Sequence, residues 1–166
     1  GNIIGLDKDG ADVIPDMSFD GGDGIYLRGT TQVVVGGSAM TRNIISGNSF
    51  GVIIDNAGGS AGMASHNVVA GNFIGTDRSG LLGRGNGTGV SVNIAGTGNI
   101  IGTNGDGVGD SEEGNVVSGN LVRSGVRIYQ TPDVVVAGNI IGMDKTGMTI
   151  VSNGDLVLGN SGLFVY

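Results

Sequence analysis

The sequence predicts an all-β solenoid, in which the chain winds into about four to five parallel coils with three short strands in each coil. Three observations support this prediction. Nearly the same decapeptide occurs three times, as GNIIGLDKDG at 1–10, GNFIGTDRSG at 71–80 and GNIIGMDKTG at 138–147. Short aliphatic runs, bounded by Gly, Asn or Ser, recur in a fixed order and are too short for helices. Glycine makes up 36 of 166 residues without a three-residue period, which excludes collagen.

The first strand of each coil has the pattern Gly-aliphatic-x-aliphatic. Equivalent strands of stacked coils should pair in parallel, about 4.8 Å apart, with alternate side chains directed into the core. One coil could not enclose these side chains alone, so neighbouring coils must share the core. The first sheet is predicted at 25–28, 52–55, 90–93, 126–129 and 163–166.

The second and third strands complete each coil. The second sheet is predicted at 33–35, 67–69, 99–101 and 134–136. The third sheet is predicted at 2–4, 43–46, 72–75, 115–118 and 139–142. Each third strand opens with an asparagine, and asparagines stacked at one corner can donate to the coil on one side and accept from the other. We interpret these five residues as a structural ladder: Asn2, Asn43, Asn72, Asn115 and Asn139.

The acidic composition excludes several classes of partner. The chain holds 15 Asp and Glu against 8 Lys and Arg, so it lacks the clustered cations that nucleic acids and anionic membrane surfaces require. No apolar run approaches the roughly 18 residues that would span a bilayer. The absence of cysteine excludes disulfides and thiolate metal sites. We therefore expect neither a nucleic-acid partner nor membrane insertion.

The stacked cycles, the asparagine corner and the strings GNxIGxD and ISGN resemble the right-handed parallel β-helix of the pectin-lyase-like superfamily. They are more closely similar to the repetitive β-helical segments of bacterial extracellular and surface proteins. The resemblance covers 1–166 and implies one β-helical domain in an extracellular or cell-surface setting. The chain begins inside a repeat motif, so we expect it to be a segment of a longer repeat protein. Because this fold hosts lyases, hydrolases, epimerases, adhesins and filament parts, the resemblance does not choose an activity.

The loop at 6–23 is a candidate calcium site. It holds six aspartates and a single lysine, whereas the sister loops at 76–88 and 143–161 lack the cluster. Calcium takes several oxygen ligands at flexible geometry, although the loop lacks the terminal glutamate of an EF-hand. The alternative is a solvated acidic loop, and 104–113 is a weaker second candidate. The predicted ligands are Asp7, Asp9, Asp12 and Asp16.

Other polar residues have structural interpretations. Asp7, Asp77 and Asp144 recur two residues after the glycine of IG, which predicts turn residues whose carboxylates accept backbone N–H groups. The single histidine, His66, directly precedes a second strand and is expected to be a turn residue rather than a base.

The outer face of the first sheet is a candidate glycan-binding surface. It carries four of the seven aromatic residues beside two arginines. Aromatic rings stack on sugar faces, while Arg, Asp and Asn side chains bond hydroxyl groups, and the resemblance implies that β-helical lyases and hydrolases bind polysaccharide on this face. Alternatively, loops fold over these rings, or Tyr166 packs on a following coil. The candidate residues are Tyr26, Arg28, Asp55, Arg127, Tyr129, Phe164 and Tyr166.

Catalysis within this segment is not expected. A glycoside hydrolase needs paired carboxylates, but the predicted face carries only Asp55, which we expect to pair with Arg28. The sequence therefore favours an extracellular scaffold or adhesive module that binds polysaccharide. The alternative is a non-catalytic part of a longer polysaccharide lyase, hydrolase or epimerase.

The predicted coils also suggest self-association. The chain starts in a third strand and stops in a first strand without an evident cap, and open strand edges recruit other chains. Head-to-tail contacts of this kind can propagate into filaments. Alternatively, longer native flanks continue the helix and supply the caps.

Overall fold

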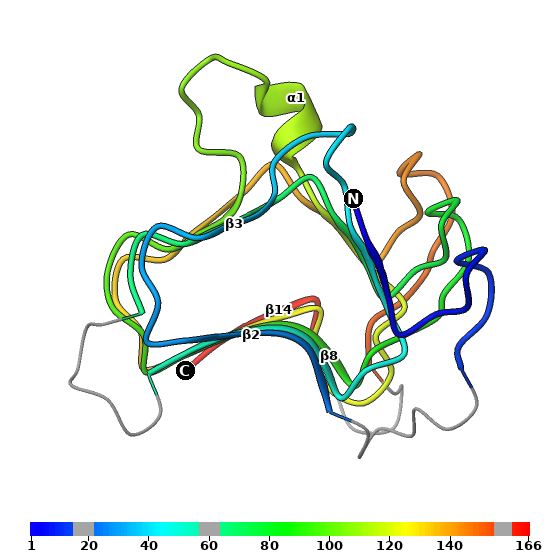
Figure 1. The fold of residues 1–166 in the computed structure, drawn as a ribbon, viewed down its shortest axis with the longest axis horizontal. Coiled ribbons are helices and arrows are strands. Elements are labelled where there is room, and N and C mark those ends of the chain that lie inside the picture. The colour runs from blue at the N-terminus through cyan, green and yellow to red at the C-terminus, as the bar shows by residue number, and fades with distance from the viewer. Residues whose placement is uncertain (15–21, 57–63, 155–160) are drawn as a thin grey trace.

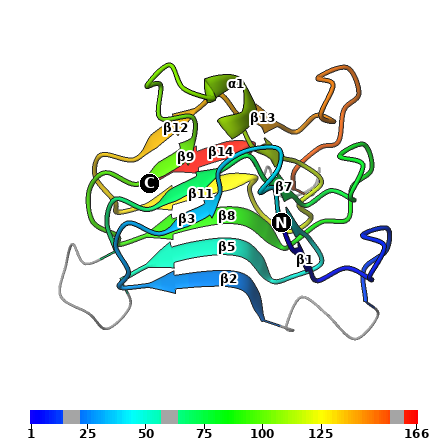
Figure 2. The ribbon, with the colours of Figure 1, turned by 45° about the horizontal axis from the view of Figure 1, so that its top comes forward.

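The protein is a parallel β-helix. The computed structural model describes residues 1–14, 22–56, 64–154 and 161–166. Viewed down the helix axis, three sheets form a roughly triangular cross-section around the core (Figure 1). The chain runs clockwise in this view from its near, blue coil to its far, red coil, which is a right-handed winding, and Figure 2 shows the same stacking from the side. The predicted fold class is confirmed.

The first sheet contains one strand from each of five coils. All neighbours pair in parallel, and the register places Ile25 beside Val52 and Val90 beside Val126. Val52, Val90 and Val126 are fully buried, so the predicted inward direction of this column is confirmed. The sheet begins two residues earlier than predicted in its first three strands. In spatial order its strands are β2 (Asp23–Arg28), β5 (Phe50–Asp55), β8 (Thr88–Asn93), β11 (Val126–Tyr129) and β14 (Leu163–Val165).

The other two sheets have shorter strands. The second sheet, displaced by one residue from its prediction, consists of β3 (Val34–Gly36), β6 (Val68–Ala70), β9 (Ile100–Gly102) and β12 (Val135–Ala137). The third sheet consists of β1 (Ile3–Ile4), β4 (Ile44–Ile45), β7 (Phe73–Ile74), β10 (Val116–Val117) and β13 (Ile140–Ile141). The part of the chain described here has one helix, the four-residue α1 (Asp110–Glu113), which was not predicted. No helix in these ranges is long and apolar enough to cross a membrane.

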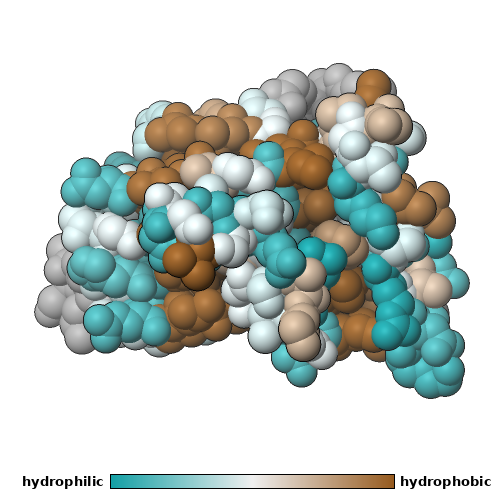
Figure 3. Space-filling model, turned by 90° about the horizontal axis from the view of Figure 1, so that it is seen from above, coloured by the Kyte–Doolittle hydropathy of each residue, from teal (hydrophilic) through white to brown (hydrophobic). Residues whose placement is uncertain are grey.

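The core lies between the inner faces of the three sheets. Aliphatic side chains fill it, with Val52 and Ile54 of the first sheet, Val69 of the second and Ile74 of the third all fully buried. Each such side chain contributes roughly 1.5–3 kcal/mol when it leaves water. On the outside of the second sheet, by contrast, Val34 and Val135 remain 60% and 47% exposed, and the strand register aligns them in one column with Val68 and Ile100. Figure 3 shows that hydrophobic residues gather on this side of the molecule.

The asparagine ladder is confirmed at the corner between the second and third sheets. Each side-chain amide donates to the Oδ1 atom of the asparagine in the next coil, at N···O distances of 2.8–3.1 Å. That oxygen also accepts the backbone N–H of the preceding asparagine. The ladder therefore satisfies both side-chain and main-chain groups where the backbone bends, as buried polar groups require. It runs through Asn2, Asn43, Asn72, Asn115 and Asn139.

Both other corners carry further asparagine pairs, which sequence analysis missed. Asn67 and Asn99 bond at 3.1 Å where the first sheet turns into the second. Where the third sheet turns into the first, the side-chain bonds are 2.9–3.0 Å long. This second ladder consists of Asn48, Asn86, Asn120 and Asn153. All three corners of the solenoid are therefore held by hydrogen bonds between asparagine side chains along its axis.

The recurring decapeptide forms a column of three stacked hairpins on the outside of the third sheet. Each hairpin closes with an isolated antiparallel bridge, and the loops lie above one another on one side of the helix (Figure 1). The backbone N–H of Arg78 donates to Gly10 O at 2.8 Å, and that of Lys145 donates to Gly80 O at 2.9 Å. The repeated letters therefore specify a repeated tertiary contact.

The intervening coils anchor the second and third hairpins through a buried serine. Ser46 Oγ donates to Thr76 O at 2.7 Å and accepts the backbone N–H of Gly75 at 3.1 Å. Ser118 makes the same pair of bonds with Met143 and Gly142 two coils later. Because the second and third hairpin coils each follow a coil with the ISGN or VSGN serine, the structural repeat is a two-coil unit.

Candidate functional site

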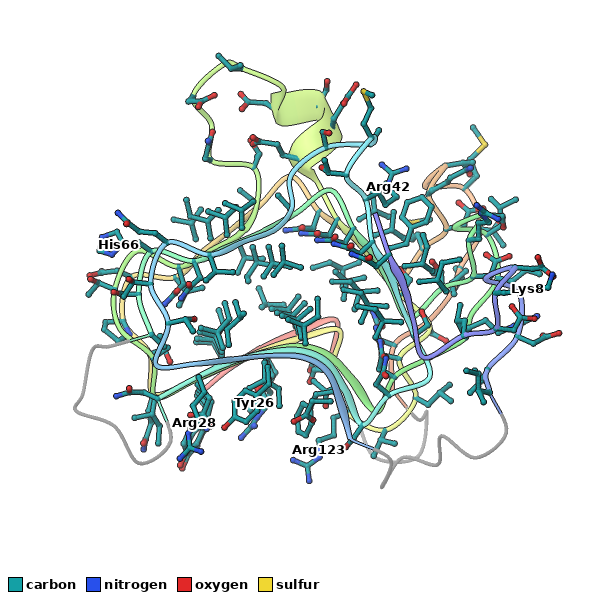
Figure 4. All side chains as sticks on the ribbon, viewed as in Figure 1. Lys8, Tyr26, Arg28, Arg42, His66 and Arg123 are labelled. Atoms are coloured by element: carbon teal, nitrogen blue, oxygen red, sulfur yellow. The ribbon has the colours of Figure 1, made fainter. Side chains whose placement is uncertain are left out.

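The outer face of the first sheet presents two columns of side chains. The strand register aligns Tyr26 with Ile53 and Arg28 with Asp55, and continues in step through all five strands. Tyr26 and Arg28 point away from the core on this face (Figure 4). The structure therefore places all seven predicted glycan-binding residues on one surface, which we call the ring face. They are Tyr26, Arg28, Asp55, Arg127, Tyr129, Phe164 and Tyr166.

A polar cluster occupies the N-terminal half of the ring face. The Tyr26 hydroxyl donates to Asp55 Oδ2 at 3.0 Å, and Asn93 Nδ2 donates to Asp55 Oδ1 at 3.4 Å. Asp55 is buried, whereas Tyr26 is 44% exposed. Burial, followed by the hydrogen bond to the Asp55 carboxylate, raises the pKa of Tyr26. The tyrosine is therefore a neutral ring with a fixed hydroxyl.

An aromatic platform occupies the C-terminal half. The rings of Tyr129 and Tyr166 are stacked with centroids 5.4 Å apart and planes inclined by 6°, and Phe164 lies 6.5 Å from Tyr166 at the same inclination. The Arg127 guanidinium is 5.1 Å from the centre of the Tyr129 ring. Stacked rings and cation–π pairs of this kind are each worth about 0.5–1.5 kcal/mol, so the platform is held in place before any ligand arrives. Phe164 and Tyr166 remain 43% and 73% exposed.

A groove of about 200 Å³ adjoins the entry to the first sheet and was not predicted. Phe50, Thr88 and Arg123 are among the residues that line it. Arg123 projects on the same side of the sheet as Tyr26 (Figure 4). Phe50 precedes the Gly-aliphatic pattern by one position, so a search limited to that pattern excluded it. The groove extends the ring face toward the third sheet.

The predicted calcium ligands have separate partners. Asp7 Oδ1 accepts the Ala11 backbone N–H at 2.9 Å, Asp9 pairs with Lys8 at 2.7 Å, and Asp12 pairs with Arg84 at 3.1 Å. Asp16 lies outside the described residues. Among the residues that are described, no three His, Cys, Asp or Glu side chains are grouped to hold a metal ion. Calcium binding by this loop stays a prediction.

The weaker candidate at 104–113 also uses its carboxylates locally. Asp110 accepts the Thr103 hydroxyl at 3.0 Å and the Gly107 N–H at 3.1 Å, while Asp106 accepts the Val108 N–H at 2.7 Å. These bonds shape a loop that ends in α1. They give the carboxylates of Asp106 and Asp110 a structural role in the loop.

The predicted turn aspartates are confirmed. Asp7, Asp77 and Asp144 each accept the backbone N–H four residues later, at 2.9–3.2 Å. The Thr146 hydroxyl bond, followed by backbone bonds that outweigh desolvation, lowers the pKa of Asp144 to about 2. The pKa of Asp7 is also lowered, chiefly by the Ala11 bond. Burial opposes the shift at Asp77, but hydrogen bonds from Ser79 and the turn still lower its pKa.

His66 is confirmed as a turn residue. Its φ of 56° lies in the left-handed region, as do the values at Gln32 and Asp133, which directly precede Val33 and Val134. The next coil has Gly98 at the equivalent position, and a Cβ there would lie 2.8 Å from the His66 ring. The His66 imidazole is thus packed against the neighbouring turn, and it lies away from the ring face of the first sheet.

No protein-family model matches the chain, and no curated protein sequence or solved structure matches it either.

Proposed function

We propose that this β-helix is a bacterial extracellular or cell-surface scaffold module that binds polysaccharide through the ring face. The observation that supports this most strongly is the pre-stacked platform of Tyr129, Phe164 and Tyr166. The rings are nearly parallel, and Phe164 and Tyr166 are exposed on an otherwise aromatic-poor chain, which suits contact with the apolar faces of sugar rings. The neighbouring polar groups provide the hydrogen bonds that fix a sugar's orientation.

The rigidity of the scaffold adds to the proposal. The strand register and the corner ladders fix the positions of side chains on successive coils, so the ring face is pre-organised along the helix axis. Pre-organised sites lose less conformational entropy when they bind. An extended polymer that lies along the axis would contact several coils at once, and its affinity would rise with chain length.

Affinity electrophoresis in gels containing neutral or acidic polysaccharides tests the proposal. The unmodified protein should be retarded by at least one polysaccharide. Tyr129→Ala and Tyr166→Ala should each reduce the retardation strongly, because the aromatic rings are the main contact surface for the sugar. Met148→Ala is a matched control, since Met148 is 86% exposed on a hairpin away from the ring face. Equal mobility of all variants in every gel would reject the proposal.

A further inference from the structure

A second surface feature lies on the opposite side of the third sheet from the core, between that sheet and the stacked hairpins. It is a groove of about 300 Å³ that reaches from the first coil to the last hairpin. Its lining includes Arg42, Arg78 and Lys145, together with Ile3, Phe73 and Met40. Three of the eight Lys and Arg residues of an acidic protein therefore line a single groove.

Local contacts position the three cationic side chains along the groove. Arg42 Nε donates to Gly71 O at 2.8 Å, and its guanidinium lies 4.2 Å from the centre of the Phe73 ring. A Cβ at Gly80 would lie 2.7 Å from that ring and 3.2 Å from Lys145 Cβ. The Arg42 guanidinium thus lies over the Phe73 ring, and Gly80 lies between that ring and the stem of Lys145.

Arg78 belongs to the same arrangement. A Cβ at Gly10 would lie 2.9 Å from Arg78 Cβ and 3.4 Å from Ile3 Cδ1, so the stem of Arg78 packs over the first hairpin beside the groove floor. Arg42 is half-buried, whereas Arg78 and Lys145 are exposed (Figure 4 labels Arg42). One anchored guanidinium is therefore flanked by two adjustable cations.

No carboxylate of the described ranges neutralises these three groups. The ion pairs there are Lys8–Asp9 and Arg84–Asp12. The aspartates next to Arg78 and Lys145 in the chain, Asp77 and Asp144, accept hydrogen bonds from their own turns and do not line the groove. Three cations gathered without an internal counter-charge repel one another, and an anion relieves that repulsion.

We propose that this groove binds an oxyanion group, that is, a carboxylate, sulfate or phosphate. The fork of a guanidinium matches two oxygens of such a group, and the two flanking cations add charge-assisted hydrogen bonds. The site is distinct from the ring face in position and in chemistry, and it does not depend on the proposed glycan function.

Titration with sodium sulfate, followed by two-dimensional NMR of the Arg42 Nε–Hε group, tests the proposal on the whole chain. A saturable shift of that resonance is expected. Arg78→Gln and Lys145→Gln should each weaken binding by about tenfold, which is the loss of one charge-assisted hydrogen bond. Both side chains are exposed, so the variants should fold as the parent does.

Lys8→Gln is the matched control, because Lys8 holds the same place in the first hairpin and the change removes the same charge. Lys8 pairs with Asp9 and does not line the groove, so its replacement should change affinity less than about twofold. A second arm replaces sulfate with dextran sulfate and with neutral dextran. Variant-sensitive binding of sulfate ion identifies a free-anion site, and variant-sensitive binding of dextran sulfate alone identifies an anionic polymer as the source. Absence of both, or equal loss in Lys8→Gln, would overturn the proposal.

Discussion

Asn72 Oδ1 accepts two hydrogen bonds from Asn43, one from the side-chain amide at 3.0 Å and one from the backbone N–H at 3.1 Å. The Asn72 amide in turn donates to Asn115 Oδ1 and to two backbone carbonyls. All of these groups are buried, so the side chain of one asparagine satisfies polar atoms in three consecutive coils. The ladder is therefore a mechanical link along the axis as well as a local cap.

Replacement of Asn72 should accordingly destabilise the whole solenoid. In Asn72→Ala, both donors of Asn43 and several carbonyl groups lose a partner, and each buried orphan costs about 1–3 kcal/mol. A loss of roughly 3–5 kcal/mol in the free energy of unfolding is expected, which is a large part of typical protein stability. Urea denaturation measures it. The exposed Asn104→Ala should cost less than about 0.5 kcal/mol, and similar losses in both variants would contradict the account.

The hairpin column should depend on a glycine that touches Phe73. Gly80 has φ of 71°, and a Cβ there would lie 2.7 Å from the Phe73 ring, whereas Gly147 has φ of 70° in the equivalent turn with no atom within 4 Å. Gly147→Ala should cost about 1–2 kcal/mol from backbone strain alone. Gly80→Ala should cost a further 1–3 kcal/mol, roughly, from overpacking. Thermal unfolding of both variants gives the difference, and equal losses would show that the hairpin does not pack on the ring.

The turn aspartates predict loss of stability in acid. A carboxylate whose pKa is lowered in the folded state stabilises the fold fully above its ordinary pKa of 3.8, and that contribution is lost as the pH falls through the folded value. For Asp144 the window runs from about 4 to about 2. Asp144→Asn should therefore be less stable than the parent at pH 6, and the gap should narrow below pH 4. Unfolding curves across this range check the direction, and a constant gap would contradict it.

Calcium binding at the acidic loop can be tested without disturbing its turn. If calcium binds only the folded state, the melting temperature should rise with calcium concentration. Asp9→Asn with Asp12→Asn should remove this rise while leaving the hydrogen bond of Asp7 to Ala11 in place. Identical melting curves in excess calcium and in EDTA would indicate a solvated loop.

Head-to-tail association can be tested at the last strand. In β14, Leu163 and Val165 remain 44% and 66% exposed, so an added coil could bury them. If copies stack, Val165→Lys should lower the apparent mass in light scattering, because a stacked interface would bury the new charge. Phe164→Lys, on the outer face of the same strand, controls for unfolding. A parent protein that is strictly monomeric at high concentration would exclude stacking.

The fold could be predicted because its main signals repeat. The five asparagines and the Gly-aliphatic strands recur once in each coil, so position in the cycle fixes both register and inward direction. The ladder through Asn48, Asn86, Asn120 and Asn153 was missed, although the signal was present, because the residue two places earlier changes from Ser in two coils to Arg84 and Val151 in the others. Recurrence of the asparagine alone would have identified it.

The remaining features of the structure depend on tertiary contacts that the repeating sequence pattern does not specify. The hairpins were predicted as excursions, but the bond between Arg78 and Gly10 joins loops two coils apart. The groove lined by Arg42, Arg78 and Lys145 was also not predicted. Arg42 reaches Phe73 from a loop whose sequence is not repeated in the other coils. The residues of the ring face were identified from the alternation of side chains along the strands. The stacking of Tyr129 on Tyr166 depends on side-chain conformations that this alternation does not determine.

The tyrosines offer the most direct test of the central claim. The chain has no tryptophan, and its three tyrosines, Tyr26, Tyr129 and Tyr166, all lie on the ring face, so intrinsic fluorescence reports on this surface alone. Titration with the polysaccharide that retards the protein in gels should change tyrosine emission saturably. Tyr129→Phe with Tyr166→Phe should remove most of the change while binding persists through the remaining rings. Binding that leaves tyrosine emission unchanged would place the ligand elsewhere and contradict the account.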